Sequence, residues 1–309
     1  MRIVFFGTPD FAVPSLETVA RSHDVARVVS RPDRPVGRHS RPEPSAVARR
    51  AEALGIPIVR PERLRDPSLA ALLRSDAPDA GVVVAYGRIL PDEILEIPRL
   101  GFVNVHASLL PRHRGASPVQ AALLAGDRET GVVTMRVVPE LDAGPLYLAR
   151  RVPIEPLDDA GALSRRLARE GADLLVQTLR RLEEGNLEAR PQEGAATFSK
   201  PISREEGLVD WNLPAPELER RLRAFTPWPG LYTFLGGERV KILRAREARP
   251  GAPRPPGTLW REEGDALAAA GAGTALVLED VQRAGGKAVA GSDFVNGLPA
   301  LPARFDDVG

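Results

Sequence analysis

Two side chains that can stabilise charge and move a proton lie two residues apart in the segment 102–106 (FVNVH). Alternation along a strand places Asn104 and His106 on one face, at the carboxyl end of that strand. In an open α/β sheet this edge is where ligands bind. An amide donor beside an imidazole suits a reaction that builds negative charge on a carbonyl oxygen. Asp142, in the glycine-bounded turn 141–144 (LDAG), is a third candidate because a carboxylate can orient or charge the imidazole.

The same residues also have a purely structural interpretation. An asparagine and a histidine at a strand end can cap a neighbouring helix instead of acting on a substrate. The residue types and spacing therefore predict carbonyl chemistry and leave the substrate open.

The elements that must hold these residues alternate between strand and helix. Short apolar runs predict buried strands at residues 2–7, 25–30, 56–59, 81–85, 102–105, 131–138 and 145–152. Helical patterns fall between them, and a long amphipathic helix at 160–182 closes the region. We expect an α/β fold with an open, mostly parallel, Rossmann-like sheet. The turn after the first strand has a single glycine, Gly7, where the dinucleotide fingerprint needs three, so NAD binding is disfavoured.

The last third of the chain has a different pattern. It combines a helix at 216–225, a hairpin around Gly236 and Gly237, and short strands at 258–261, 266–270 and 275–279. These predict a smaller C-terminal β-barrel of the oligonucleotide-binding (OB-like) type. We place a catalytic domain at 1–185, an interdomain linker at 186–204 and the C-terminal domain at 205–309, and expect the tail from Leu298 onward to be mobile.

Composition excludes several classes of protein. The 42 basic and 41 acidic residues leave a net charge of +1, which excludes a globally polybasic nucleic-acid or membrane-surface binder. Without cysteine there is no disulfide scaffold, thiol nucleophile or cysteine-bound zinc, and a total of four histidines disfavours a multi-histidine metal site. No apolar run approaches the roughly 20 residues that span a bilayer, so we expect a cytoplasmic protein.

Motifs spread over most of the chain resemble the folate-dependent formyltransferases. Around the candidate site they are 104–106 (NVH), 108–111 (SLLP), 114–115 (RG) and 141–144 (LDAG). The others are 6–12 (FGTPDFA), 32–35 (PDRP), 84–91 (VAYGRILP), 210–211 (DW), 223–230 (RAFTPWPG) and 293–297 (DFVNG). Each motif alone is moderately specific for this family, whereas the order and spacing of all of them together are very specific for it.

The resemblance implies the formyltransferase fold and a defined reaction. The formyl group of 10-formyltetrahydrofolate, a co-substrate, would pass to the α-amino group of methionine on initiator tRNA, with no metal and no nucleotide. Asn104 would donate to the oxyanion, His106 would add charge stabilisation or proton transfer, and Asp142 would hold His106. The resemblance also implies a monomer acting in translation initiation.

It further implies two binding regions. The folate site would comprise two groups of residues: Ser108, Leu109, Leu110 and Pro111, and Ala85, Tyr86, Gly87, Ile89 and Leu90. The leucine side chains are equally consistent with ordinary core packing. Contacts to tRNA would come from Arg38, Arg41, Lys200 and Arg204.

The charge pattern supports tRNA contact only locally. Residues 31–42 hold four arginines and one aspartate, a net charge of +3, and guanidinium groups bind phosphates and stack on bases. The loop reads RHSRPE at 38–43, where the family commonly has Gly-Lys-Lys-Leu-Met after the arginine. The alternative to a tRNA-binding role is that this segment is an ordinary solvated surface loop. The C-terminal region 201–309 has 14 basic and 15 acidic residues and adds no bulk attraction.

Three other functions share some of these features. A formyltransferase acting on an amino sugar or a purine-pathway amine would use the same candidate catalytic residues. The motifs at 223–230 and 293–297 resemble the tRNA enzyme, and a purine-pathway transferase would not need them. A 10-formyltetrahydrofolate hydrolase would replace the amine with water. A non-enzymatic RNA-binding protein would leave Asn104, His106 and Asp142 unexplained.

Overall fold

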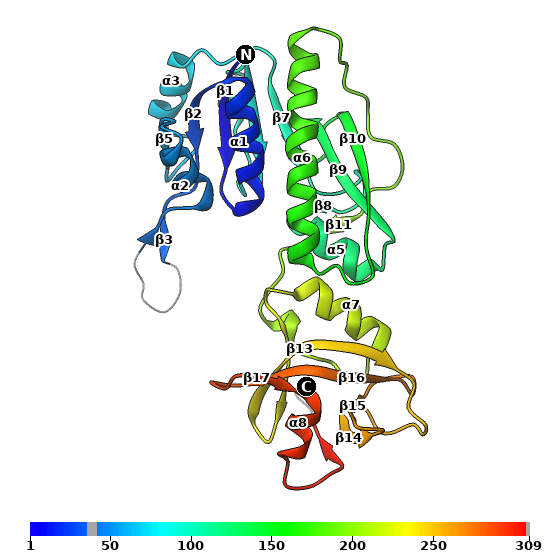
Figure 1. Ribbon diagram of the computed structural model, residues 1–309. Helices are drawn as coiled ribbons and strands as arrows, with labels where there is room; N and C mark the ends of the chain where they lie inside the picture. The colour runs from blue at the N-terminus through cyan, green and yellow to red at the C-terminus, as the bar shows by residue number, and fades with distance from the viewer. Residues whose placement is uncertain (36–41, 307–309) are drawn as a thin grey trace. The chain divides into compact units, whose positions relative to one another are not determined.

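The computed structural model describes residues 1–35 and 42–306. The chain folds into two compact units (Figure 1). The first comprises Met1–Pro118, Arg128–Ile154 and Leu163–Lys200, and the second comprises Val119–Asp127, Glu155–Ala162 and the chain from Pro201 onward. The sequence-based boundaries at 185 and 204 stay predictions, and the first unit continues as far as Lys200.

A seven-stranded sheet forms the centre of the first unit, in the order β10-β9-β7-β6-β1-β2-β5. Its strands are β1 (Arg2–Gly7), β2 (Asp24–Val29), β5 (Ile58–Val59), β6 (Ala80–Val84), β7 (Phe102–His106), β9 (Glu129–Arg136) and β10 (Leu146–Pro153). Strands β5, β2, β1, β6 and β7 are parallel to their neighbours among these five. Strand β9 pairs antiparallel with both β7 and β10. The predicted open, mostly parallel sheet is confirmed.

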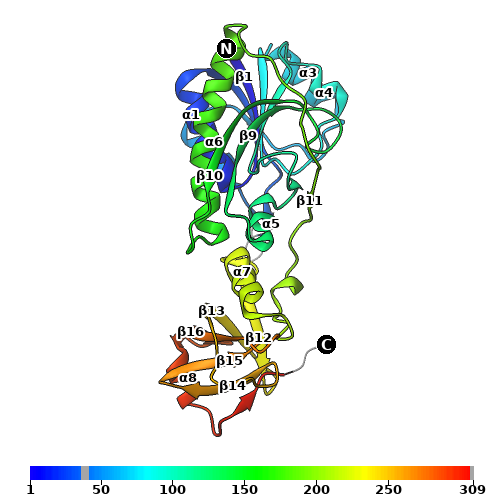
Figure 2. The ribbon, with the colours of Figure 1, turned by 90° about the vertical axis from the view of Figure 1, so that its right-hand side faces the viewer.

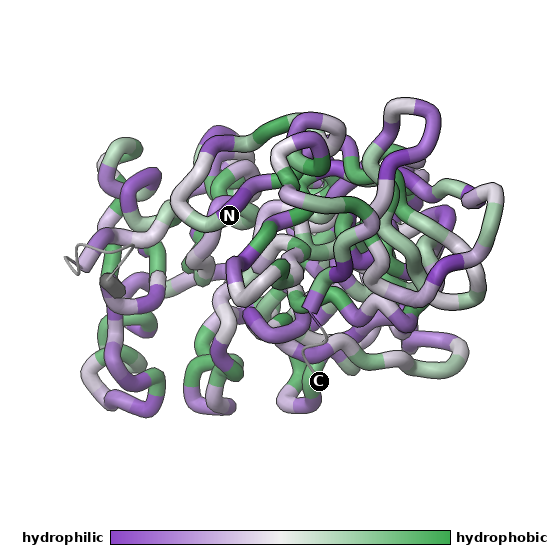
Figure 3. The backbone as a smooth tube through the Cα atoms, turned by 90° about the horizontal axis from the view of Figure 1, so that it is seen from below, coloured by the Kyte–Doolittle hydropathy of each residue, from purple (hydrophilic) through white to green (hydrophobic). Residues whose placement is uncertain are grey.

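Helices cover both faces of this sheet (Figures 1 and 2). They are α1 (Val13–Ser22), α2 (Ala46–Ala53), α3 (Pro67–Ser75), α4 (Asp92–Leu95) and α6 (Ala160–Glu183). Ile3 and Phe5 pack with α1, α2 and α6 on one side, while Val4 and Phe6 pack with α3 and α4 on the other. Because successive strand residues point to opposite faces, the unbroken apolar run of β1 fills both cores. Coloured by hydropathy, the backbone carries hydrophobic and hydrophilic residues interspersed along the chain (Figure 3). In a helix, this mixture within each turn gives one face that can be buried.

Short elements complete the first unit. A 3₁₀ turn at Asp10–Ala12 precedes α1. Strand β3 (Arg34–Pro35) pairs antiparallel with β4 (Pro42–Glu43). Strand β8 (Arg114–Gly115) pairs parallel with β11 (Phe198–Ser199), which brings the end of the predicted linker onto the loop after β7. Helix α5 (Pro118–Ala125) follows β8 along the chain, and from Val119 onward it belongs to the second unit.

The second unit is built on a curled antiparallel sheet. Its path runs β12 (Leu231–Leu235), β13 (Glu238–Ala248), β16 (Ala275–Arg283), β15 (Asp265–Ala269), β14 (Thr258–Glu262) and β18 (Ala303–Arg304), with β17 (Ala288–Ala290) beside β16. A 3₁₀ turn at Glu205–Gly207 and the helices α7 (Ala215–Phe225) and α8 (Gly291–Asn296) complete the unit. The backbone N–H of Asp306 donates to the carbonyl of Phe234 at 2.8 Å, so the chain after β18 returns to β12. This architecture agrees with the predicted OB-like domain.

The predicted mobile tail is wrong for the residues around β18. Phe305 is buried, and its ring stacks on that of Trp211 with the centroids 5.0 Å apart. The carboxylate of Asp306 accepts hydrogen bonds from the N–H groups of Gly236 and Gly237 in the β12–β13 turn. The sequence gives little sign of this because the aromatic residue lies in a short proline-containing segment without strand or helix periodicity.

Candidate active site

The end of β7 presents the two candidate residues that opened the sequence analysis. Strand β7 lies between β6 and β9 in the sheet, and Asn104 is backbone-paired with Val83 and Met135. The Asn104 side chain is half-buried, and its amide forms no hydrogen bond with any of the described residues. An amide at the binding edge of the sheet is thereby left able to donate to a ligand.

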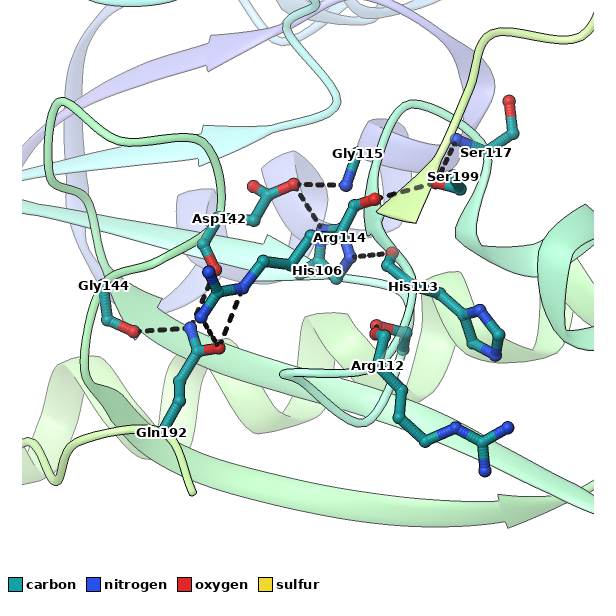
Figure 4. A network of polar contacts seen from close by, with 11 residues as sticks. His106, Arg112, His113, Arg114, Gly115, Ser117, Asp142, Gly144, Gln192 and Ser199 are labelled. Atoms are coloured by element: carbon teal, nitrogen blue, oxygen red, sulfur yellow. Dashed lines mark hydrogen bonds and ion pairs between the residues drawn. The ribbon is translucent and has the colours of Figure 1, made fainter. Parts of the chain in front are cut away.

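The His106 ring, by contrast, is held from both sides (Figure 4). Its Nε2 lies 3.1 Å from the carbonyl oxygen of His113, and its Nδ1 lies 3.7 Å from Oδ2 of Asp142. Burial lowers the pKa of His106 below its ordinary value, and this effect is larger than the opposing effects of the Asp142 carboxylate and the His113 carbonyl. The ring is therefore neutral at pH 7.

The partners of the ring fix its tautomer. A carbonyl oxygen only accepts, so Nε2 must carry the proton that it donates to His113. The lone pair of the neutral ring then lies on Nδ1, on the side of the Asp142 carboxylate. A distance of 3.7 Å is too long for a direct hydrogen bond but allows the carboxylate to stabilise a positive charge on the ring.

Asp142 is fixed by its backbone and by a neighbouring loop. Its φ is +49°, in the left-handed region that few residues other than glycine adopt. Its Oδ2 accepts a hydrogen bond of 2.8 Å from the N–H of Gly115 in β8. Two residues later only glycine fits, because a Cβ on Gly144 would lie 1.8 Å from the carbonyl oxygen of Arg136.

Gln192 joins the two loops that meet at Asp142 (Figure 4). Its Nε2 donates to the carbonyl oxygens of Asp142 and Gly144, both at 2.8 Å. Its Oε1 accepts from Nη2 of Arg114 at 2.6 Å and from Nε at 3.2 Å. Gln192 was not predicted from the sequence, because a glutamine in a proline- and glycine-containing stretch has no pattern that separates it from a linker.

Two further residues of the predicted linker hold the same loop. The N–H of His113 donates to Oγ1 of Thr197 at 2.8 Å. Ser199 accepts from the N–H of Ser117 and donates to the carbonyl of Arg114, both at 3.1 Å. The alternation of polar, aromatic and polar residues at 197–199 was the one available signal for a strand here.

The first predicted folate segment forms the loop between β7 and β8. Ser108 is fully buried and donates to the carbonyl of Arg112 at 2.6 Å. Leu110 packs with Val133 and Met135, which agrees with the core-packing alternative, while Leu109 is half-buried. Pro111 is buried, and the bond that precedes it is cis.

The second predicted folate segment follows β6. Ala85 and Gly87 both have positive φ, +46° and +76°, and both are exposed. Tyr86 between them is buried in the core against Phe6, where burial raises the pKa of its hydroxyl. Leu90 is buried as well, whereas 70% of Ile89 is exposed. The structure thus brings this segment and the first one to the carboxyl ends of two adjacent parallel strands.

The four predicted tRNA-binding residues are spread along the chain. Arg38 and Arg41 lie outside the described residues. Lys200 is exposed at the end of the first unit, and Arg204 is exposed near the start of the polypeptide that forms most of the second. Within ranges 1–35 and 42–306, no group of His, Asp and Glu side chains is arranged to hold a metal ion. Over the same ranges, no helix has both the length and the apolar character needed to cross a bilayer.

Comparison with known proteins decides the family. Residues 1–179 match the family described as formyl transferase, and residues 201–299 match the formyl transferase C-terminal domain. This chain belongs to the formyl transferase family. The resemblance inferred from the motifs is confirmed.

Relatives of this formyltransferase match it along nearly its whole length. A Thermus thermophilus protein named methionyl-tRNA formyltransferase is 49% identical over 302 residues, which are 98% of each chain. A protein of the same name from Chloroflexus aurantiacus is 44% identical over 310 residues, covering 99% of this chain and 100% of its own.

Solved structures share the fold at low identity. The sugar 3N-formyl transferase WlaRD is 18% identical, with a TM-score of 0.65 over 92% of this chain and 97% of its own. HypX from Aquifex aeolicus in complex with tetrahydrofolic acid is also 18% identical, with a TM-score of 0.62 over 96% of this chain and 47% of its own. These similarities support the formyltransferase fold alone.

Proposed function

We propose that this formyltransferase transfers the formyl group of 10-formyltetrahydrofolate to the α-amino group of methionine on initiator tRNA. The choice of acceptor rests on the full-length similarity to proteins named methionyl-tRNA formyltransferase, which includes the C-terminal domain. The chemistry rests on one observation: His106, whose Nδ1 faces the Asp142 carboxylate, lies two residues from an Asn104 amide that has no hydrogen-bond partner among the described residues.

Asn104 acts on the charge that develops during transfer. The folate donor supplies an activated formyl carbon, and attack by the amine places negative charge on the formyl oxygen. The Asn104 amide donates a hydrogen bond to that oxygen. A donor aimed at a developing oxyanion typically contributes a factor of about 10²–10³ in kcat.

His106 and Asp142 act on the proton that the amine must lose. The free Nδ1 of His106 accepts this proton, either directly or through one water, and the ring becomes an imidazolium between the His113 carbonyl and the Asp142 carboxylate. The imidazolium returns a proton to the folate nitrogen as the bond between that nitrogen and the formyl carbon breaks. An ordinary α-amino group has a pKa of about 7.7–8.0, so a sizeable fraction of the amine is already nucleophilic at neutral pH. It can attack the formyl carbon directly, without a covalent enzyme intermediate.

The two segments at the carboxyl ends of β6 and β7 are the proposed folate site. Residues 85–90 form an exposed turn around the buried Tyr86 ring, and the backbone groups of such a turn suit the polar edge of a pterin. Ser108, Leu109, Leu110 and Pro111 form the neighbouring loop, whose buried Ser108 bond and proline limit its movement.

For tRNA we propose the arginine-rich loop with Arg38 and Arg41, together with Lys200 and Arg204. A hollow of about 230 Å³ in the second unit offers further cations, because Arg239, Lys241 and Arg283 line it. Guanidinium and ammonium groups at such a site suit backbone phosphates. We expect the enzyme to act as a cytoplasmic monomer with a catalytic domain at 1–185, a linker at 186–204 and a tRNA-contacting domain at 205–309.

The test is incubation with 10-formyltetrahydrofolate and charged initiator tRNA, with formyl-methionine and formate measured separately. We expect tRNA-dependent formylation. Equal formate release with and without tRNA would favour a hydrolase, and transfer to an amino sugar but not to tRNA would favour the sugar enzymes.

Asn104→Ala tests the proposed oxyanion donor in the same assay. We expect the rate to fall about 10²–10³-fold. Asn186→Ala, which removes an exposed asparagine just beyond α6, is the matched control and should retain full activity. Near-wild-type turnover of Asn104→Ala would remove Asn104 from the catalytic set.

A further inference from the structure

The segment that follows α6 reaches the candidate site through two side chains. Across residues 191–200 only Gln192 and Ser199 are half-buried, while the remaining side chains are exposed. Ser199 belongs to the β8–β11 ladder, and Gln192 inserts between the Arg114 guanidinium and the turn at 141–144 (Figure 4). The burial of the Gln192 amide against the Asp142 turn, in a segment whose other side chains are mostly exposed, indicates a specific role for this amide.

We propose that Gln192 is a positioning residue that sets the place of the Asp142 carboxylate relative to the His106 ring. The inference rests on the roles proposed for His106 and Asp142. Gln192 touches neither the His106 ring nor the Asp142 carboxylate. It holds the backbone of the turn that carries the carboxylate, through the carbonyls of Asp142 and Gly144.

The chemistry of the contacts requires an amide. The two carbonyl oxygens need a group with two N–H donors, and the Arg114 guanidinium needs an acceptor. A glutamine side chain supplies both at once. Glutamate would keep the acceptor for Arg114 but lose both donors and bring negative charge against two carbonyl oxygens.

The arrangement closes a ring of contacts around Asp142. Gln192 ties the turn to Arg114, the next residue along the chain is Gly115, and the Gly115 N–H holds the Asp142 carboxylate. The carboxylate and its backbone are thus fixed by the same two-residue strand β8. Asp142 needs such support because its left-handed φ is unfavourable for a residue with a Cβ.

The experiment compares Gln192→Met and Gln192→Glu with the wild type in the full-length enzyme. Titration of the His106 imidazole by NMR reports the electrostatic contact directly, and the signal is assigned by its absence from His106→Asn. The pH profile of kcat and the KM for each substrate are measured alongside. Asp66→Ala, which removes the N-cap hydrogen bonds of α3, is the control for general destabilisation.

We expect both Gln192 variants to lower kcat about 10–100-fold while each KM stays within about twofold of its wild-type value. In both variants the His106 pKa should fall, because the nearby carboxylate that raises it has moved away. Asp66→Ala should lose thermal stability and keep the pH profile. The Glu variant keeps the Arg114 contact, so it remains informative if the Met variant folds poorly.

An unchanged His106 titration in both variants would overturn the positioning role, whatever happens to stability. A shifted titration with unchanged kcat would support the positioning role and contradict the proposed catalytic role of His106. The two failures are therefore distinguishable.

Discussion

Replacing Asp142 with asparagine removes one negative charge from beside the His106 ring while keeping the shape of the turn. The asparagine carbonyl can still accept from the Gly115 N–H, which Asp142 now binds at 2.8 Å. The oxygen in that contact, Oδ2, is also the atom 3.7 Å from Nδ1 of His106, so a neutral amide oxygen would face the ring in place of a negative charge. The substitution therefore removes the charge that stabilises the imidazolium formed when the amine loses its proton.

The size of the effect follows from the distance between the groups. Two unit charges 3.7 Å apart, the separation between Nδ1 and Oδ2, interact by roughly 4 kcal/mol at an effective dielectric constant of about 20. That dielectric value suits this pair, because the side chains of His106 and Asp142 are only 7% and 13% exposed. An interaction of this size corresponds to a factor of about 10³ in an equilibrium constant. We expect kcat to fall about 10²–10³-fold and the His106 pKa to fall below its wild-type value.

The assay is single-turnover formylation of charged initiator tRNA, with His106 titrated by NMR in the same protein. Glu140→Gln is the matched control, since it removes a carboxylate from the exposed start of the same turn. It should leave both measurements within about twofold of the wild type. A kcat for Asp142→Asn within fivefold of the wild type would refute the proposed stabilisation of the imidazolium.

Three further predictions concern stability. Gly115→Ala should cost at least about 2 kcal/mol in urea unfolding, because φ is +114° and the new Cβ would lie 2.3 Å from the Ser199 carbonyl oxygen. Gly185→Ala, at φ +69° with open space around it, should cost less, and equal costs would contradict the clash. The free energy of unfolding should drop as pH falls below 6.5, because burial lowers the folded-state pKa of His106 and the unfolded chain binds the proton first. His106→Gln should flatten that slope, and an identical slope would remove His106 as its source. Phe305→Ala should cost about 3–5 kcal/mol, since the ring is fully buried, and a loss below 1 kcal/mol would indicate that the end of the chain does not hold the sheet.

The sequence was most informative where local pattern and burial coincide. The first strand was expected at residues 2–7 and lies at Arg2–Gly7, because four consecutive apolar residues that end at a glycine are typical of a buried parallel strand. The hairpin around Gly236 and Gly237 was found for the same reason, since both glycines have the positive φ that a two-residue turn needs. Phe305 was missed because the proline-containing segment 298–309 shows no strand or helix periodicity.

For the site, the sequence located Asn104, His106 and Asp142 but missed Gln192, which holds the Asp142 turn from a distant segment. Asn104 and His106 were identifiable together because one strand carries both. Gln192 lies far along the chain from Asp142, and a hydrogen bond between a side chain and a distant backbone carbonyl leaves no pattern in either segment. The tautomer of His106 was likewise unpredictable, since it depends on the His113 carbonyl oxygen that the folded loop brings against Nε2.

The position of β11 also sets the order in which the site can form during synthesis. All seven strands of the first sheet leave the ribosome before α6 is complete at Glu183, and Gln192 and Ser199 follow only afterwards. A nascent chain that has emerged as far as α6 can form its sheet and both cores, while the turn of Asp142 and the strand β8 still lack the contacts that fix them. Assembly of the site is thus a late event in the folding of the first unit, completed by the segment that leads toward the second.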